Sequence, residues 1–466
     1  MTDPTLVHDL EKLFLRAAVG GLPQDWFERV DDRTLAAWLE RAPREVRALL
    51  QKTLGADRAL RFISALERRV DVGLDSLDDA RAVAPDPDKP VVVLLPGFMG
   101  VHLADATVGR IWLDPAAALR GDLAARATLD ESGTVDTFPE ESLSPDGLVR
   151  LIYADLIQAL RAAGHAVHPF PFDFRRSLVN STLLLRDLVE GLVAQQPTSK
   201  IVLVGHSMGA LLACLLPEEW PAFTEHVEQI IFLGGPLRGT FDAVESVIGT
   251  HWILPRLVQL SPSESSLDFQ TSLATWPGVF CMLPDPVAFP DGDCSSAFDQ
   301  TRWPPEVPVR QTMLDEALIL KEKIRESAIF KLEKPVIQLL STRYPTVGAL
   351  TQTPEGRFAA GPRTSQGDGV VAARSALVPG VVGYRTSYPH TLAPVEHAAI
   401  QAVLDLIRTG TCSLPPLDAS DVAAELTPGQ SPETDIAEGL IASGAEFMKG
   451  GLLSFAGIAW LFSPLR

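Results

Sequence analysis

The middle of the chain alternates short, unbroken apolar runs with longer segments of helical periodicity. Such runs are typical of strands buried on both faces of a parallel sheet, and they occur at residues 91–95, 201–204, 229–233, 335–340 and 381–384. Helices are predicted at residues 148–163 and 183–193, with a further strand between them at residues 165–170. This alternation predicts a doubly wound α/β fold whose reactive groups lie beyond the carboxyl ends of the strands.

The run at residues 201–204 leads directly into Gly205-His206-Ser207-Met208-Gly209 and then into a small, aliphatic helix that ends near Pro217. A G-x-S-x-G sequence between a buried strand and a helix predicts a nucleophile elbow, in which the serine hydroxyl stands exposed above the sheet. The alternative is an ordinary helix N-cap serine. We favour the elbow for Ser207, because a cap does not need glycine on both sides.

Candidate acid and base residues follow Ser207 in the chain. Asp368 lies in a glycine turn, Gly367-Asp368-Gly369, and two histidines, His390 and His397, come after it. The order serine, aspartate, histidine is the one expected of an α/β-hydrolase. We predict His397 as the base because it precedes a helix, whereas Pro389-His390 resembles a turn; spacing alone leaves His390 open.

The first apolar run ends in Pro96-Gly97-Phe98-Met99-Gly100, a loop that can bring backbone N–H groups close to a ligand. The N–H groups of Phe98 and Met208 are therefore the candidate oxyanion hole for acyl transfer. The alternative is a connection in which proline and glycine serve only to turn the chain. His206, next to Ser207, is expected to be structural. Asp173, Arg175 and Arg176 are expected to form a structural salt bridge, and the alternative is that they help to shape the site.

Four further segments flank or interrupt the predicted hydrolase domain, residues 86–411. Residues 1–85 form a predicted helical module, which could dock a protein partner or pack on the main domain. Residues 241–333 interrupt the alternation and predict a lid over the site. A linker at residues 412–435 precedes an apolar tail at 436–466, which is too short in its uncharged part to span a bilayer and could dock on the protein or lie in a membrane interface.

Composition narrows the possible partners and compartments. The net charge of −19 and the isoelectric point of about 4.9 argue against binding to nucleic acid. The four cysteines form no disulfide framework, and the N-terminus shows no secretory signal, so we expect a cytoplasmic protein that could associate peripherally with membranes. No metal-ligand spacing is present, and we predict neither a catalytic metal nor a cofactor.

Taken together, the stretches PVVVLLPGFMG, PFDFRRS, VGHSMGA, LGGPLRG, CMLPDP, GDGVV and EHAAI resemble the lecithin:cholesterol acyltransferase-like lipases and acyltransferases. The resemblance implies an α/β-hydrolase whose catalytic residues fall on Ser207, Asp368 and His397 and whose substrates are ester-linked lipids. Val370 departs from the family, which usually has threonine after the Gly-Asp-Gly turn. The resemblance covers neither the N-terminal module nor the tail.

These observations predict a serine hydrolase that cleaves or transfers the acyl groups of lipid esters through an acyl-enzyme. One alternative is a carboxylesterase for small soluble esters. A second alternative, from a different class of protein, is a partner-binding scaffold that has kept a hydrolase fold without turnover.

Overall fold

The computed structural model describes residues 85–112, 121–251, 253–261, 263–290, 293–417 and 426–427. Nearly all of the predicted N-terminal module and the whole apolar tail therefore lie outside the described residues. Among the residues that are described, no helix combines the length and apolar character needed to cross a membrane.

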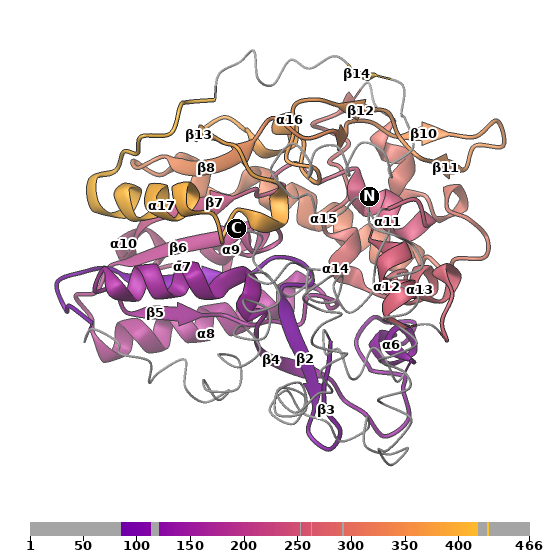
Figure 1. Ribbon diagram of the computed structural model, residues 1–466, viewed down its shortest axis with the longest axis horizontal. Coiled ribbons are helices and arrows are strands. Elements are labelled where there is room, and N and C mark those ends of the chain that lie inside the picture. The colour runs from indigo at the N-terminus through magenta and orange to yellow at the C-terminus, as the bar shows by residue number, and fades with distance from the viewer. Residues whose placement is uncertain are drawn as a thin grey trace, which may run out of the picture.

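Six strands form the central sheet: Val91–Leu95 (β1), Val167–Pro169 (β5), Ile201–His206 (β6), Val227–Leu233 (β7), Val336–Ser341 (β8) and Val381–Thr386 (β13). Their order is β13-β8-β7-β6-β1-β5, and every neighbouring pair is parallel (Figure 1). Each of these strands overlaps a segment predicted from the apolar runs, and β1, β6 and β8 are buried along their whole length. The doubly wound α/β prediction is confirmed.

The winding of the sheet reverses at β1, which pairs with β5 on one side and with β6 on the other. The loops that leave the carboxyl ends of β1 and β6 therefore diverge, and this is where ligands bind in open α/β sheets. Ser207 directly follows β6, and Gly97 and Phe98 follow β1.

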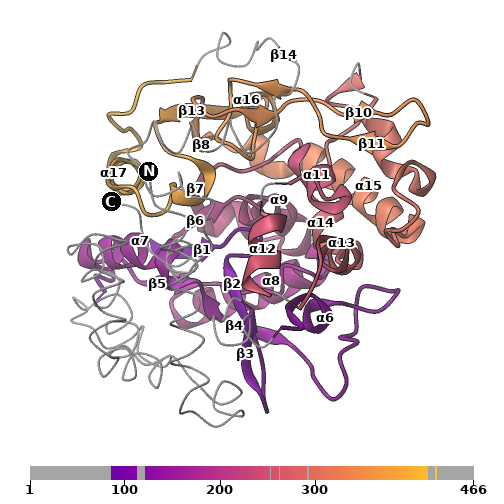
Figure 2. The same cartoon turned by 45° about the vertical axis from the view of Figure 1, so that its right-hand side comes forward.

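Helices cover both faces of the sheet. Arg150–Ala162 (α7) and His397–Thr409 (α17) contact each other on one face, and Leu178–Gln195 (α8) and Gly209–Glu219 (α9) contact each other on the opposite face (Figure 2). Eight consecutive residues of α9 are buried, because this helix packs directly on β1 and β6. The short helices Phe223–His226 (α10) and Ala373–Ala376 (α16) complete this part.

The segment between β7 and β8 is a helical insertion. It contains Asp242–Ile248 (α11), Leu254–Leu260 (α12), Ser266–Leu273 (α13), Pro277–Phe280 (α14) and Gln311–Glu326 (α15), with 3-10 turns at Cys294–Phe298, Gln300–Arg302 and Ala328–Lys331. Most of its inner residues join the main hydrophobic core, and Phe241, Phe289 and Cys294 form a small separate cluster with Val347. The insertion is therefore a continuous wall of the protein beside the carboxyl ends of the strands.

Smaller elements complete the described fold. Val101–Asp105 (β2), Gly109–Trp112 (β3) and Ser144–Leu148 (β4) form an antiparallel sheet beside Leu123–Ala127 (α6). The remaining strands are each two residues long: Thr346–Val347 (β9), Thr351–Gln352 (β10), Phe358–Ala359 (β11), Arg363–Thr364 (β12) and Leu426–Thr427 (β14). A 3-10 turn, His390–Leu392 (η5), lies between β13 and α17.

Candidate active site

Ser207 has the backbone of a nucleophile elbow. Its φ angle is 51°, a left-handed conformation that is uncommon outside glycine, and it lies between β6 and α9. The flanking glycines are required by space, because a Cβ atom on Gly209 would lie 2.3 Å from the carbonyl oxygen of Leu95 and one on Gly205 would lie 3.0 Å from Ala210 N. Glycine at 209 therefore lets the turn pass close to β1, and glycine at 205 makes room for the start of α9.

Asp368 and His390 meet beyond the ends of β7 and β8. Nδ1 of His390 lies 2.8 Å from Oδ2 of Asp368, and both side chains are buried. The other carboxylate oxygen accepts the backbone N–H groups of Val370 at 3.0 Å and Val371 at 2.7 Å. Because the carboxylate only accepts, His390 carries its proton on Nδ1, and the lone pair of Nε2 remains available as a base.

Two further contacts fix this pair. The backbone N–H of His390 donates to the carbonyl of Asp368 at 2.8 Å. Gly234 has a φ of 65°, and a Cβ atom there would lie 2.8 Å from both Asp368 Oδ2 and His390 Nδ1. The loop after β7 thus leaves room for the aspartate and histidine to meet.

Of the two candidate histidines, the structure places His390, and not His397, against Asp368. His397, predicted as the base, is the exposed first residue of α17 and is not among the residues that line the cavity containing Ser207, Asp368 and His390. The turn η5 brings His390 back over the sheet, whereas α17 has already turned toward the surface. The feature that made His390 resemble a turn residue is therefore the feature that places it in the site.

The loop after β1 closes the site on another side. A Cβ atom on Gly97 would lie 2.8 Å from Ser207 Cβ, and Met99 in the same loop has a φ of 61°. Within the described part of the chain, neither Phe98 N–H nor Met208 N–H donates to a protein acceptor. These two N–H groups, which have no acceptor among the described residues, thus lie on the β1 loop and directly after Ser207.

A buried chain of hydrogen bonds joins this loop to the His390 loop. Gly97 N–H donates to the Tyr153 hydroxyl at 2.8 Å, and that hydroxyl lies 2.8 Å from Nδ1 of His206. Nε2 of His206 lies 3.1 Å from the His390 carbonyl oxygen. Since a carbonyl only accepts, Nε2 of His206 carries the proton, and its Nδ1 accepts from Tyr153.

Both ring nitrogens of His206 are therefore occupied, which excludes it as the base for Ser207. Burial, with a smaller contribution from neighbouring His390, lowers the pKa of His206 to about 3, so the ring is neutral at physiological pH. Burial also raises the pKa of the Tyr153 hydroxyl, which stays protonated. Our expectation of a structural role for His206 missed this link, and Tyr153 was not recognised because it lies within an ordinary amphipathic helix.

Replacing Tyr153 with phenylalanine should lower kcat about tenfold and change KM less than twofold. The substitution keeps the ring but leaves the Gly97 N–H and His206 Nδ1 without their buried partner, a loss of about 1–3 kcal/mol for each group. Steady-state kinetics measure the effect. Tyr384→Phe is the control, since no described residue pairs with the Tyr384 hydroxyl; an equal loss in both variants, or a change in KM alone, would contradict the positioning role.

The cavity at this site has a volume of about 220 Å³ and a largely apolar lining. Its apolar wall comes from the β1 loop, the small β2-β3-β4 sheet and the insertion, and includes Phe98, Trp112, Leu257, Leu273, Val279 and Met282. Ser207 and His390 line the same cavity. An apolar chain attached to a group at Ser207 could therefore lie against residues of the insertion.

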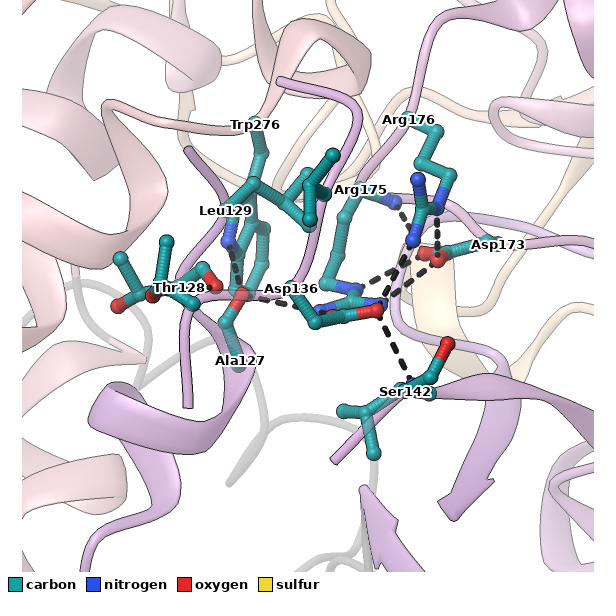
Figure 3. A network of polar contacts seen from close by, with 12 residues as sticks. Ala127, Thr128, Leu129, Asp136, Ser142, Asp173, Arg175, Arg176 and Trp276 are labelled. Atoms are coloured by element: carbon teal, nitrogen blue, oxygen red, sulfur yellow. Dashed lines mark hydrogen bonds and ion pairs between the residues drawn. The ribbon is translucent and has the colours of Figure 1, made fainter. Parts of the chain in front are cut away.

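An ion-pair network holds part of this wall in place (Figure 3). The buried guanidinium of Arg175 donates to Asp173 at 2.7 Å and Asp136 at 2.6 Å, and it also bonds the Ala127 carbonyl. Nε1 of Trp276, from the insertion, donates to the same carbonyl at 2.8 Å. Because the Trp276 ring packs 6.0 Å from that of Phe98, the network supports the loop beside Ser207; it supplies no group to the reaction centre itself.

The sheet order, the elbow and the family comparison together define an α/β-hydrolase. Residues 134–333 match the family model described as lecithin:cholesterol acyltransferase. This match and the fold are consistent with a lecithin:cholesterol acyltransferase-like α/β-hydrolase, and they support an esterase or acyltransferase. The matched residues include Ser207 and the whole insertion, whereas Asp368 and His390 lie beyond them.

Several solved structures are similar to the chain at low identity. The mature lipase BlEst2 of Bacillus licheniformis is 14% identical over 70% of this chain and 96% of the lipase, with a TM-score of 0.36. A chain in the structure of the Tle4–Tli4 complex is 14% identical over 69% of this chain and 98% of its own length, with a TM-score of 0.46. No curated protein matches the sequence. At these TM-scores the class assignment rests on the sheet, the elbow and the family match.

Proposed function

We propose that the protein is a serine hydrolase or acyltransferase acting on ester-linked lipids, with Ser207 as nucleophile, His390 as base and Asp368 as the acid that orients it. The observation that carries the proposal is the 2.8 Å contact between His390 Nδ1 and Asp368 Oδ2 in the cavity that Ser207 also lines. The apolar lining of this cavity supports a substrate with an acyl chain.

In the proposed reaction, Ser207 Oγ bonds to the ester carbonyl carbon while Nε2 of His390 takes the hydroxyl proton. Asp368 stabilises the resulting imidazolium through Nδ1. The N–H groups of Phe98 and Met208 donate to the oxyanion, a contribution of about 3–4 kcal/mol for each donor. His390 then gives its proton to the leaving alcohol as the ester C–O bond breaks, which leaves an acyl-enzyme.

The second half of the catalytic cycle, deacylation, removes the acyl group. A water molecule or a second alcohol gives its proton to His390 and attacks the acyl carbon, and the proton returns to Ser207 as the acyl-enzyme breaks down. Water would make the protein a lipase or phospholipase, and an alcohol would make it an acyltransferase. The insertion, which supplies Leu257 and Met282 to the cavity, is the proposed lid over the acyl chain.

A fluorophosphonate probe tests the proposal because it reacts only with an activated serine. We expect stoichiometric labelling of the wild type, detected by intact-protein mass spectrometry, and none of Ser207→Ala. Ser181→Ala is a matched control, since Ser181 is also buried but lies on α8, and this variant should label like the wild type. An unlabelled but folded wild type would favour the non-catalytic scaffold.

Substrate preference distinguishes a lipid enzyme from a carboxylesterase that acts on small soluble esters. A lipid enzyme should turn over long-chain esters in micelles faster than the same esters below their critical micelle concentration, because the apolar cavity and insertion would meet an interface. A carboxylesterase for small soluble esters would show little gain. Comparing butyrate and oleate esters of one alcohol decides between these two substrates.

A further inference from the structure

A second group of polar side chains lines the cavity from the insertion. Asp242 and Ser246 lie on α11, and His251 follows it; all three are buried and line the cavity that also holds Ser207 and His390. The proposed reaction uses none of them. Burying a carboxylate in the wall of an apolar cavity costs free energy unless it is paired, so the groups that face Asp242 decide what it can bind.

The geometry around His251 fixes which groups face Asp242. Nδ1 of His251 accepts the backbone N–H of Ile253 at 3.1 Å, so the ring proton lies on Nε2. That nitrogen lies 2.6 Å from Oδ2 of Asp242. The protonated ring nitrogen thus lies against one carboxylate oxygen, and this close contact places the imidazole beside Asp242.

The other carboxylate oxygen of Asp242 has no side-chain or backbone donor among the described residues. The hydroxyl of Ser246 donates to the Asp242 backbone carbonyl at 3.0 Å, so it can accept but has no proton left for the carboxylate. A carboxylate oxygen in a cavity wall can only accept hydrogen bonds. It therefore suits a ligand with a hydroxyl or another donor and disfavours one with a phosphate.

A buried ion pair anchors α11 from behind. Glu245, on the same helix, lies 3.1 Å from Nη2 of Arg363 and accepts the backbone N–H of Gly361 at 3.0 Å. The positive charge of Arg363 thus faces Glu245 rather than the cavity, where no lysine or arginine occurs among the described lining residues. The helix that carries Asp242 is held by this pair, and the cavity wall keeps an acidic, acceptor-only group.

We propose that Asp242, oriented by His251, binds a free hydroxyl on the alcohol part of the substrate, so that the protein prefers uncharged, hydroxyl-bearing esters such as acylglycerols over phosphate-bearing ones. The inference rests on the proposed function, because Asp242 selects the ester that Ser207 attacks. The acyl chain lies along the apolar wall, and the alcohol part lies toward α11.

Two oleate esters that differ only in hydroxyls test the subsite. Monooleoylglycerol and propyl oleate, presented in the same detergent micelles, share the acyl chain and the three-carbon alcohol. The wild type should show a kcat/KM for monooleoylglycerol at least tenfold above that for propyl oleate. In Asp242→Asn this ratio should fall roughly 10- to 100-fold, since a hydrogen bond to a charged group is lost.

With oleoylglycerol phosphate as the substrate, Asp242→Asn should change the relative kcat/KM in the opposite direction. The wild type should turn it over poorly, and Asp242→Asn should raise its kcat/KM relative to that for monooleoylglycerol, because the repulsion between phosphate and carboxylate is removed. Asp187→Asn, an exposed carboxylate on α8, should leave all these ratios as in the wild type.

The outcomes separate this proposal from the one on which it depends. A wild type that labels with fluorophosphonate but cleaves monooleoylglycerol and propyl oleate equally well would overturn the subsite and leave the hydrolase intact. The subsite would also be overturned if Asp242→Asn lowered kcat/KM for both esters by the same factor. If the wild type neither labels nor cleaves any of the three esters, the hydrolase proposal itself fails. The ratio of kcat/KM for monooleoylglycerol to that for propyl oleate in the wild type tests the subsite by itself, so the experiment does not depend on the folding of Asp242→Asn.

Discussion

His390→Ala should lower kcat roughly 10⁶-fold, while His397→Ala should keep at least half of the wild-type activity. In a serine hydrolase the removal of the base costs about as much as the removal of the serine, because the hydroxyl is a poor nucleophile without it. His390 is buried against Asp368, whereas His397 is exposed at the start of α17. Single-turnover acylation with a chromogenic oleate ester measures the difference.

The fold should tolerate His390→Ala, which keeps this result interpretable. The backbone N–H of residue 390 donates to Asp368 and its carbonyl accepts from His206, and neither bond needs the side chain. A melting temperature within a few degrees of the wild type is expected. If His397→Ala lost the activity and His390→Ala kept it, the assignment of the base would return to the helix start.

The fold could be predicted because the apolar runs that encode parallel strands are local. The run at residues 201–204 and the glycines around Ser207 are sufficient to predict a strand, an elbow and a buried helix, and the structure has all three. Asp368 was recognisable for a similar reason, since glycines on both sides of an acid mark a tight turn.

The choice of His390 over His397 as the proposed base could not be made in this way, because it depends on a contact between distant segments. Gly234, which lies 156 residues before His390 in the chain (390 − 234), leaves the space in which that ring meets Asp368. Nothing in the local sequence of His390 or His397 reports this space. The same is true of Tyr153 and His206, whose spacing suits an amphipathic helix and a strand end while their hydrogen bonds join loops far apart in sequence.

Asp242 and His251 were missed for a different reason. They lie in the insertion, where the alternation of strands and helices lapses and the pattern predicts only a lid. The pair is nine residues apart (251 − 242), a spacing with no helical meaning because the helix ends between them. Only the close approach of the two side chains connects them.

Asp368→Asn should lower kcat roughly 10⁴-fold and leave KM within about threefold of the wild-type value. The amide oxygen of asparagine can still accept the N–H groups of Val370 and Val371, so the turn keeps its shape. The amide nitrogen then faces Nδ1 of His390, and since it can only donate, it forces the ring proton onto Nε2. A base that already carries a proton on Nε2 cannot take the proton of Ser207, which is why an isosteric change has so large an effect.

A variant that combines Asp368→Asn with His390→Ala tests whether the two residues act through one mechanism. If Asp368 acts only through His390, then Asp368→Asn combined with His390→Ala should be no slower than His390→Ala alone, because the orienting group has nothing left to orient. Additive losses would mean that Asp368 supports the site by another route, and a loss of less than tenfold in the single variant would remove it from the reaction. The four rates are measured with one oleate ester, and fluorophosphonate labelling of each variant reports the reactivity of Ser207 independently of turnover. A slow but detectable labelling of Asp368→Asn, intermediate between the wild type and His390→Ala, is the outcome that the geometry of the carboxylate and imidazole requires.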